Sequence, residues 1–513
     1  MTIVKITDCS KGFNPDQLPE ELGDGVWNRV ENMRFRAGFA ERFRGMANVM
    51  TTPTITPYFI TPYQTTNDRF WVYAGTQKVF ADNGTTQTEI TPASLFTGGV
   101  DDRWTGGTLA GLLVLNNGVD NPTYWNGNVA TDLATLPGWN TNWKANSIRP
   151  FKNYLVALNV SKSGTRYPHM VKWSHSADPG TMPTSWDETD VTKDAGEQDL
   201  AETPDLLVDA LPMGDALIVY KERSMYSMTF VGQPYIWRFQ RLPGDSGMLA
   251  RGCGVATPVG HVVLTAGDVI VHQAQGVESI ADAQIRKYIF NNIDQTNYKR
   301  AFVTSNPQRN EVLICFPVNG GDGTCQKAAV WNWVDKTWGL RDLSSVTYGA
   351  SGQANITTGS TTWDTDTDGW DTDATEWNET EYSPNEARLL FCRSTPAISA
   401  FDSGSTDYGT AFTALLERSA MTFGDATTNK MIRTIYPRFD AGAGTTIQIQ
   451  CGYAFSSTQA PTWKPATTFT VGTSNKADIF CNGKYLAIRF FTTGNAKWRL
   501  RSFDIDLVTT GVY

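Results

Sequence analysis

The residue types best suited to binding a metal lie in the stretch WDTDTDGWDTDATEW, residues 363–377. Asp364, Asp366 and Asp368 alternate along it and a glycine follows, as in the first half of an EF-hand calcium loop. An EF-hand also needs a bidentate glutamate at its twelfth position, which is Thr375 here, and helical sequence on both sides, which is missing. The sequence therefore predicts no EF-hand and no metal site, while ordinary calcium ligation by these aspartates stays open as an alternative.

The same stretch places a tryptophan at every seventh position, at Trp363, Trp370 and Trp377. A coiled coil needs two apolar positions in each heptad, and sequence rich in Thr and Asp disfavours helix. One continuous strand is also excluded, because an odd spacing points successive tryptophans to opposite faces. Residues 361–385 carry eight acidic side chains and no Lys or Arg. We therefore expect an exposed, turn-rich loop whose three indoles dock on a partner surface, since Trp supplies a large contact area.

Signatures of catalysis are scarce. The sequence has no P-loop, no GxGxxG after a strand and no HExxH. Residues 244–247, GDSG, resemble the nucleophile loop of serine proteases, but that site also needs a histidine base and an orienting acid. The four histidines are His169, His175, His261 and His272, and none has a neighbourhood typical of a triad. We expect a β-turn at 244–247, no enzymatic activity, no catalytic residue and no cofactor.

Two further polar motifs have a structural and a functional interpretation. Residues 176–180, SADPG, with Trp186 resemble the Asp-box turn of sialidase-type propellers, where the aspartate stabilises a turn between strands. Lys221, Glu222 and Arg223 interrupt a pair of apolar strand segments. A solvated hairpin turn is the favoured interpretation of these three residues, and a polar cluster at a blade centre or a subunit contact is the alternative.

Composition places these residues on strands and turns. The chain has 513 residues, of which 40% are hydrophobic and 12% aromatic, so a large core is available and disorder is not expected. Glycine is abundant, and Thr, Val, Tyr, Phe and Trp recur in short bursts, which favours an all-β fold. The net charge of −9 gives no support for a general nucleic-acid binder, which usually has a basic face.

Cysteine usage and the N-terminus indicate where the protein is made. The seven cysteines are odd in number, scattered and without a CxxC pair, so we expect buried free thiols in a reducing cytosol. The N-terminal residues MTIVKITDCS lack the apolar region of a signal peptide, and no apolar run approaches membrane-spanning length. We expect a soluble protein, without membrane insertion, that is made and assembled inside a cell.

A pattern of apolar strand, turn and second strand recurs along the chain, with Asn-Gly or similar pairs at the turns. The units that show it are 69–84, 111–127, 152–160, 215–232, 260–276, 310–321 and 387–404. Small sheets of this kind cannot bury both faces alone, and radial stacking covers them. The pattern predicts an irregular β-propeller of six or seven blades, with stacked β-sandwiches as the alternative. A short helix is expected at 282–293, where Ile285, Tyr288, Ile289 and Ile293 share one face.

Three regions follow from this pattern. We predict an N-terminal arm at 1–50, a propeller-like platform at 51–409 that includes the acidic Trp-repeat loop 361–385, and a β-sandwich-like C-terminal domain at 410–513. The C-terminal domain carries 11 Lys and Arg against 6 Asp and Glu, a net charge of +5, which leaves −14 for the rest. Such an asymmetry is informative about contacts rather than about fold.

The order of several segments resembles a known family. The run from Gly12 to Glu41 (GFNPDQLPEELGDGVWNRVENMRFRAGFAE), with 217–232, 328–343, the WDTD repeats and 483–506, looks like the tail nozzle or tail-hub proteins of short-tailed bacteriophages. This group includes the packaged-DNA stabilisation proteins. The similarity is spread over nearly the whole chain, and the order of the segments carries it. Lys484 departs from the pattern, which has arginine there.

The resemblance implies a structural, non-enzymatic virion protein. Proteins of this family form a ring, typically a homohexamer, at the distal end of a short tail, so the resemblance implies the same for this chain. The virion, with its tail, is assembled in the host cytoplasm. The ring attaches to the tail adaptor or connector below the portal, and tail fibres, tailspikes or a needle attach to it. Double-stranded DNA passes through the lumen without specific binding, and the ring helps to retain the genome and then release it. The alternatives are a receptor- or glycan-binding propeller, acting as an adhesin, and a glycan-hydrolysing propeller.

Overall fold

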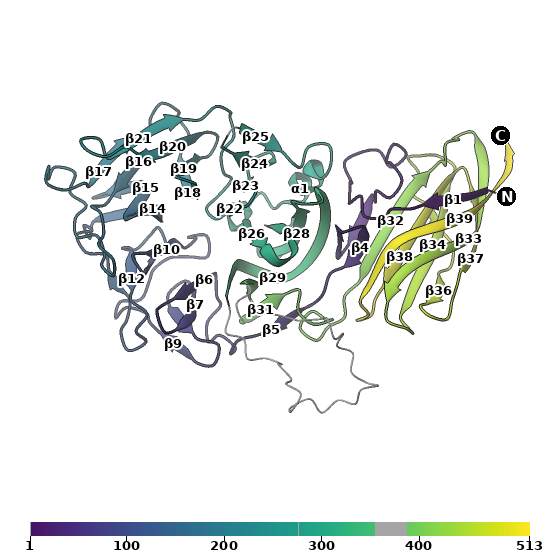
Figure 1. The fold of residues 1–513 in the computed structure, drawn as a ribbon, viewed down its shortest axis with the longest axis horizontal. Coiled ribbons are helices and arrows are strands. Elements are labelled where there is room, and N and C mark those ends of the chain that lie inside the picture. The colour runs from purple at the N-terminus through teal and green to yellow at the C-terminus, as the bar shows by residue number, and fades with distance from the viewer. Residues whose placement is uncertain (1, 275, 354–386, 513) are drawn as a thin grey trace.

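The computed structural model describes residues 2–274, 276–353 and 387–512, and strands dominate this part of the chain. The described helical elements are short: α1 (Arg286–Asn292) and the 3-10 turns η1 (Tyr298–Arg300) and η2 (Pro307–Arg309). Figure 1 shows two bodies side by side, a ring of small sheets and a C-terminal β-domain that carries both chain termini. The prediction of an all-β, propeller-like fold is confirmed.

Five separate four-stranded antiparallel sheets follow one another along the chain and form blades 1 to 5. Blade 1 contains β6 (Phe59–Gln64), β7 (Arg69–Ala74), β8 (Val79–Asp82) and β9 (Gln87–Glu89). Blade 2 contains β10 (Thr105–Leu109), β11 (Leu112–Asn116), β12 (Thr123–Trp125) and β13 (Ala134–Thr135). Blade 3 contains β14 (Trp143–Phe151), β15 (Tyr154–Lys162), β16 (Thr165–Trp173) and β17 (Gly196–Asp199). Blade 4 contains β18 (Leu207–Met213), β19 (Ala216–Lys221), β20 (Met225–Phe230) and β21 (Trp237–Arg241), and blade 5 contains β22 (Gly254–Thr257), β23 (Gly260–Leu264), β24 (Val269–Gln273) and β25 (Gly276–Ser279).

Blades 6 and 7 share one long strand, β29 (Thr337–Gln353). Blade 6 consists of β26 (Phe302–Asn306), β27 (Glu311–Pro317), β28 (Cys325–Asn332) and the first part of β29. The second part of β29 pairs with β30 (Ala387–Arg393), and β31 (Ala397–Phe401) and β5 (Met46–Asn48) complete blade 7. The first strands β10, β14, β18, β22 and β26 lie against one another in order, and β29 lies against both β26 and β6. The ring is therefore closed, and an N-terminal strand supplies the outer strand of its last blade.

The C-terminal domain is a sandwich of two sheets. Its strands are β32 (Ala414–Met421), β33 (Thr428–Ala441), β34 (Thr446–Ala454), β35 (Thr462–Trp463), β36 (Thr467–Thr470), β37 (Ala477–Gly483), β38 (Tyr485–Thr492) and β39 (Trp498–Val512). One sheet has the order β2-β32-β38-β34-β35, and β4, β39, β33 and β37 follow one another in the other. Phe490 on the first sheet and Phe503 on the second meet edge to face, with ring centroids 5.2 Å apart. Alternating apolar residues on both sheets thus fill one core.

Residues 1–50, predicted as an arm, are built into both bodies. β1 (Thr2–Ile6) pairs with β39, and β2 (Arg29–Glu31) pairs with β32 of the sandwich. β3 (Met33–Arg36) pairs with β29 of the propeller, while β4 (Phe39–Arg42) pairs with both β3 and β39. Trp27, Met33 and Phe35 are buried in the core that these strands share. Burial of these apolar side chains requires partners on both sides, which explains why the segment does not extend alone.

The helix predicted at 282–293 is present but shorter. Of the predicted face, Ile285, Ile289 and Ile293 are buried and Tyr288 is half-buried, while α1 begins at Arg286. The Asp16 carboxylate of the N-terminal segment accepts hydrogen bonds from the backbone N–H groups of Lys287 (2.7 Å) and Tyr288 (3.1 Å). A side chain distant in sequence therefore satisfies the free donors that mark the helix start.

The cysteine prediction also agrees with the structure, because all seven are free and buried: Cys9, Cys253, Cys315, Cys325, Cys392, Cys451 and Cys481. In the described part of the chain, no helix has both the length and the apolar character needed to cross a lipid bilayer.

Candidate functional site

The sequence-predicted docking residues Trp363, Trp370 and Trp377 lie outside the described residues, as do the alternating aspartates beside them. Within residues 2–274, 276–353 and 387–512, no three or more His, Cys, Asp or Glu side chains are grouped so that they could hold a metal ion. The polar chemistry that the structure does describe is concentrated at the propeller axis and at the junction between the two bodies.

At the propeller axis, a buried carboxylate connects three consecutive blades. Asp209, on the innermost strand of blade 4, forms an ion pair with Arg149 on the innermost strand of blade 3, with Nη2 and Oδ2 2.6 Å apart. It also accepts hydrogen bonds from the hydroxyl of Ser147 (2.8 Å) and from the backbone N–H of Gly252, just before blade 5 (3.2 Å). Burial alone would raise the pKa of Asp209, but Arg149 outweighs this effect and the pKa is lowered. Asp209 is therefore held as a carboxylate at the centre of the ring.

Aromatic rings fill the other side of the axis. Tyr348 on β29 lies between Phe59 of blade 1 and Phe302 of blade 6, with ring centroids 5.1 and 5.2 Å away. Arg103, just before blade 2, has its Cζ 5.5 Å from the Tyr348 ring centroid and donates a hydrogen bond to the Thr347 carbonyl (3.0 Å). Burial raises the pKa of Tyr348 against the opposing charges of Arg149 and Arg103. Blades 1, 6 and 7 and the segment that precedes blade 2 thus meet on this side of the axis.

The axial cluster carries more positive than negative charge. Arg251, which precedes blade 5, donates to the backbone carbonyl of Asn146 (2.6 Å). Burial lowers the pKa of Arg251 to about 10, even though Asp209 acts in the opposite direction. Backbone carbonyls and one carboxylate accept hydrogen bonds from these guanidinium groups, although Nε of Arg103 is buried without a partner. The arrangement therefore fixes the blades relative to one another.

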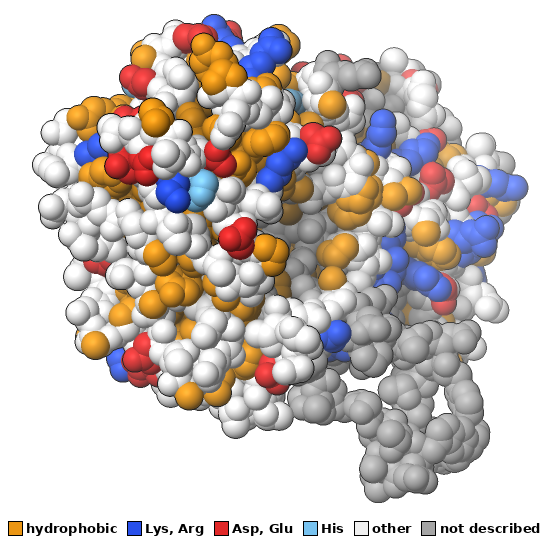
Figure 2. Space-filling view, turned by 60° about the vertical axis from the view of Figure 1, so that its left-hand side comes forward, with side chains coloured by type: hydrophobic (Ala, Val, Ile, Leu, Met, Phe, Trp, Pro, Cys, Tyr) orange, Lys and Arg blue, Asp and Glu red, His pale blue; other side chains and the backbone are white. Residues whose placement is uncertain are grey.

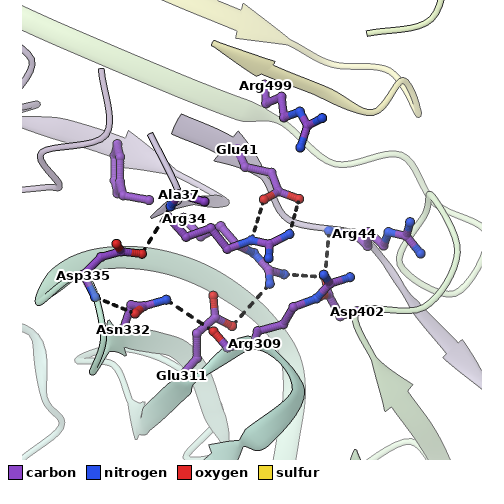
Figure 3. Close-up of polar contacts among 12 residues, drawn as sticks. Arg34, Ala37, Glu41, Arg44, Arg309, Glu311, Asn332, Asp335, Asp402 and Arg499 are labelled. Atoms are coloured by element: carbon purple, nitrogen blue, oxygen red, sulfur yellow. Dashed lines mark hydrogen bonds and ion pairs between the residues drawn. The ribbon is translucent and has the colours of Figure 1, made fainter. Parts of the chain in front are cut away.

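The junction between the bodies contains a second buried cluster, shown in Figure 3. Arg34 on β3 bonds Glu311, the first residue of β27, with Nη1 and Oε2 3.3 Å apart, and it also bonds the Asp402 carboxylate. Asp402 directly follows β31 of blade 7. Its carboxylate also pairs with Arg309 (Nε to Oδ2, 3.4 Å) and accepts a hydrogen bond from the backbone N–H of Arg44 (3.1 Å). These contacts tie the N-terminal hairpin to blades 6 and 7.

The two carboxylates at this junction, Glu311 and Asp402, have very different pKa values. Burial raises the pKa of Glu311 to about 7, because Arg34 offsets only part of the desolvation. Burial acts in the same direction on Asp402, but Arg34 and Arg309 outweigh it and hold the pKa at about 2. Asp402 is thus the charged partner of Arg34 at neutral pH, and Glu311 is the group that exchanges a proton there.

A third buried pair joins the propeller to the entrance of the C-terminal domain. Arg341 on β29 is fully buried, bonds the Asp407 carboxylate and donates to Asn32 Oδ1 (2.8 Å). The Phe412 ring lies between two guanidiniums, 3.9 Å from Cζ of Arg42 and 4.2 Å from Cζ of Arg341. Such cation–π contacts are strongest where water is excluded. The connection into the second body is therefore rigidly held.

The prediction of a solvated turn at Lys221, Glu222 and Arg223 is wrong for one of the three residues. Glu222 and Arg223 are exposed, but Lys221 is fully buried at the end of β19. Its ammonium group donates to the carbonyls of Leu200 (3.0 Å) and Thr203 (2.8 Å) and lies 3.5 Å from the Asp205 carboxylate. These acceptors compensate for the loss of water, so Lys221 belongs to a buried polar cluster beside the β19–β20 turn instead of a solvated turn.

The remaining polar motifs are structural where the chain is described. Residues 244–247 form an irregular bend rather than the predicted β-turn: Gly244 and Asp245 are exposed, while Gly247 is buried. Asp178 is exposed and its carbonyl accepts the Thr181 N–H (3.0 Å), while Trp186 is buried edge to face against Trp139, with centroids 4.7 Å apart.

Arg34, Glu311, Arg149 and Asp209 were missed as functional candidates. Their only sequence signal is a charged residue within or beside an apolar strand, which does not identify a distant partner.

Comparison with known proteins adds little beyond this geometry. No family model matches the sequence, and no curated protein matches it. Solved structures that are similar include BBS1N in complex with ARL6DN, at 11% identity over 70% of this chain and 97% of that chain, with a TM-score of 0.38. They also include the WD40 β-propeller domain of Doa1, at 9% identity over 72% of this chain and 100% of that chain, with a TM-score of 0.32. The propeller is therefore identified by its strand pairing alone.

Proposed function

We propose that the chain is a subunit of a ring in the tail of a short-tailed bacteriophage, a nozzle that extends the DNA-ejection channel below the portal and adaptor. The observation that carries the proposal is the position of residues 12–41, the first of the segments that resemble tail nozzle proteins. Its strands β2, β3 and β4 pair with both the sandwich and the propeller, and Arg34 anchors them to blades 6 and 7. A wall built from such subunits has no free hinge between its two bodies.

The filled axis determines where a channel could lie in this proposal. Tyr348, Phe59, Phe302, Arg103 and the Arg149–Asp209 pair occupy the centre of the propeller. DNA therefore has no passage through an individual propeller at this level, and the lumen of a nozzle must lie between copies of the chain. Closed rings of identical subunits use heterologous interfaces, in which two different surfaces of the subunit meet.

The charge distribution fits a conduit better than a DNA-binding protein. Residues 1–409 carry a net charge of −14 and residues 410–513 one of +5. Tight binding to the phosphate backbone requires clustered Lys and Arg, whose neutralisation of phosphates would also impede movement of the genome. In the view of Figure 2, Lys and Arg side chains gather on the C-terminal domain. The exposed residues there include Arg438, Arg499 and Arg501. We propose that this side contacts other tail proteins while the acidic propeller lines the lumen.

Negative-stain microscopy with mass photometry tests the proposal directly. The purified full-length chain, alone and with the tail adaptor protein, should give closed rings. Each ring should have a central hole that lies between the subunits and not within one propeller. The mass should correspond to an integral number of copies, with six expected. Single propellers under both conditions, or a virion map that places the chain away from the genome's exit path, would contradict the proposed function.

A further inference from the structure

Two of the chain's four histidines meet a tyrosine at the boundary between blades 4 and 5. Tyr220 lies on β19, and His261 and His272 are cross-strand partners on β23 and β24. The Tyr220 hydroxyl lies 2.8 Å from Nδ1 of His261 and 2.9 Å from Nδ1 of His272. The three side chains are 0, 2 and 4% exposed, respectively. One buried hydroxyl from blade 4 is thus held between two imidazoles of blade 5.

The surrounding contacts determine where each proton lies. Nε2 of His261 is 2.8 Å from the Pro212 carbonyl, which can only accept, so this nitrogen carries the proton. In neutral His261, Nδ1 is then an acceptor and receives the hydroxyl proton of Tyr220. The Tyr220 oxygen in turn accepts from Nδ1–H of His272. The result is one directed chain from His272 through Tyr220 and His261 to Pro212, and it requires His261 to be neutral.

Protonation of His261 breaks this chain. A charged His261 presents N–H at both nitrogens, so the Tyr220 oxygen would face two donors and its own proton would lose its acceptor. Protonation of His272 keeps its hydrogen bond to Tyr220 but places a buried charge beside the imidazole of His261. Burial lowers the pKa of both histidines, and burial together with the neighbouring His261 lowers the pKa of His272 to about 4.

Other charged side chains on the adjoining strands are engaged elsewhere. On β18, Asp209 is paired with Arg149; on β19, Lys221 is bound to Thr203 and Asp205; on β25, Glu278 is exposed. Strands β20, β22, β23 and β24 contain no Asp, Glu, Lys or Arg. The charge state of this cluster is therefore set by the two imidazoles and their burial.

We propose that Tyr220, His261 and His272 form an acid-sensitive latch that holds blade 4 against blade 5 at neutral pH and is released when acid protonates the imidazoles. The latch borders an open groove of about 550 Å³, lined by residues that include Pro212, Thr257, Pro258, His261 and Gln273. Protons reach His261 from this groove. Release separates the β18–β19 turn from the β22–β23 turn, which are two of the segments that line the groove.

Nitrogen-15 NMR of histidine-labelled protein tests the neutral arrangement. At pH 7.5, we expect one buried histidine with its proton on Nε2 (His261) and one with its proton on Nδ1 (His272). Both should titrate well below the ordinary histidine value of about 6.5. Either the same tautomer for both residues or a pKa near 6.5 for both would overturn the latch.

Hydrogen exchange measured by mass spectrometry tests the release. With a pKa of about 4 in the closed state and about 6.5 in the open state, the open population should rise about 30-fold between pH 7.5 and pH 5 from His272 alone. Amides of β18, β19, β23 and β24 should lose protection accordingly, after correction for intrinsic rates, while blades 1 and 2 should not. The double variant His261→Gln/His272→Gln should lack this pH response.

Two single variants complete the test. Tyr220→Phe removes the central hydroxyl and should loosen the same four strands already at pH 7.5, whereas Tyr235→Phe, at an exposed tyrosine, should not. If the double histidine variant does not fold, the titration of the wild-type protein still decides the matter. A pH response that is equal in the wild type and the double variant, or one spread evenly over all blades, would overturn the proposal.

Discussion

Arg34 Nη1 lies 3.3 Å from Glu311 Oε2, so a side chain of the N-terminal hairpin forms a buried ion pair with the first residue of β27 in blade 6. The two residues are 277 positions apart in sequence and are 2% and 1% exposed. Asp402 from blade 7 shares the same guanidinium. One cation thus joins three segments that are distant along the chain, which makes it the clearest place to test how the two bodies are held together.

Replacement of Arg34 by methionine should destabilise the protein strongly. Removing one partner of a buried ion pair leaves the other charge uncompensated, which typically costs about 3–5 kcal/mol. Urea denaturation at pH 7 measures the free energy of unfolding. Arg29→Met is the matched control, because Arg29 pairs with Glu31 at 2.8 Å but its side chain is 56% exposed, and the change should stay below about 1 kcal/mol. A similar loss in both variants would contradict the importance of the junction.

Glu311→Gln should change how stability depends on pH. The folded pKa of Glu311, about 7, lies above its ordinary value, so the native state binds this proton more tightly than the unfolded chain does. The stabilising contribution is complete below about pH 4.5 and is lost as the pH rises through 7. The free energy of unfolding of the variant, measured relative to that of the wild type, should therefore rise by up to about 3 kcal/mol between pH 4.5 and 8. Urea denaturation across this range measures the difference, and Glu89→Gln, at a half-exposed residue, is the control. A constant difference would show that Glu311 does not titrate there.

Asp209→Asn should weaken the centre of the propeller. The substitution removes the charge that Arg149 requires in a buried site and that lowers the cost of burying Arg251. We expect a loss of about 3–5 kcal/mol in the free energy of unfolding, measured by chemical denaturation. Asp215→Asn is the control, since that carboxylate is fully exposed beside Lys152. An unchanged stability in Asp209→Asn would mean that the axial network does not hold the blades.

The tryptophan repeat should matter for assembly more than for folding. We expect the triple variant Trp363→Ala, Trp370→Ala and Trp377→Ala to keep the unfolding midpoint of the wild type but to lose ring formation or docking of a tail partner. Exposed aromatic anchors contribute binding energy rather than fold stability. The control is the double variant Thr365→Ala and Thr372→Ala in the same segment. Intact tails at normal yield in the triple variant would refute the prediction.

Titration calorimetry with calcium examines the aspartates of the same segment. Because Thr375 occupies the position of the bidentate glutamate, we expect little heat and no defined stoichiometry for the full-length chain. Asp364→Asn with Asp366→Asn is the comparison variant. A stoichiometric isotherm in the wild type that disappears in this variant would show that the segment does bind calcium.

Local strand patterns were readable from the sequence. The segment 215–232 was predicted as two strands with a turn, and it forms β19 and β20 with the turn at Glu222 and Arg223. The helical face of Ile285, Ile289 and Ile293 was also correct. Alternation and helical periodicity report which residues face a core, and this information is contained in a few neighbouring residues.

The pairing of distant strands was not readable. A period of two identifies the buried face of a strand but not the strand beside it, so nothing in residues 46–48 indicates that β5 pairs with β31. The same limit applies to the polar clusters. Arg34 and Asp209 are charged residues whose burial depends on partners far away in sequence, while Lys221 depends on backbone carbonyls that lie outside its own hairpin. A charged side chain near a turn is most often solvated.

Blade 7 combines β5, from the N-terminal region, with β29, β30 and β31, and this has a consequence for biosynthesis. β5 leaves the ribosome early, but its partner β31 follows about 350 residues later, which corresponds to roughly 20–70 s of translation at ~5–20 residues per second. During this time six complete blades can form, while blade 7 still lacks its two outer strands, β31 and β5. β1 has to wait longer still, because it pairs with β39 at the end of the chain. The nascent protein therefore cannot mature from one end to the other, because blade 7 and the sandwich are each completed late, when an N-terminal strand pairs with a strand made much later.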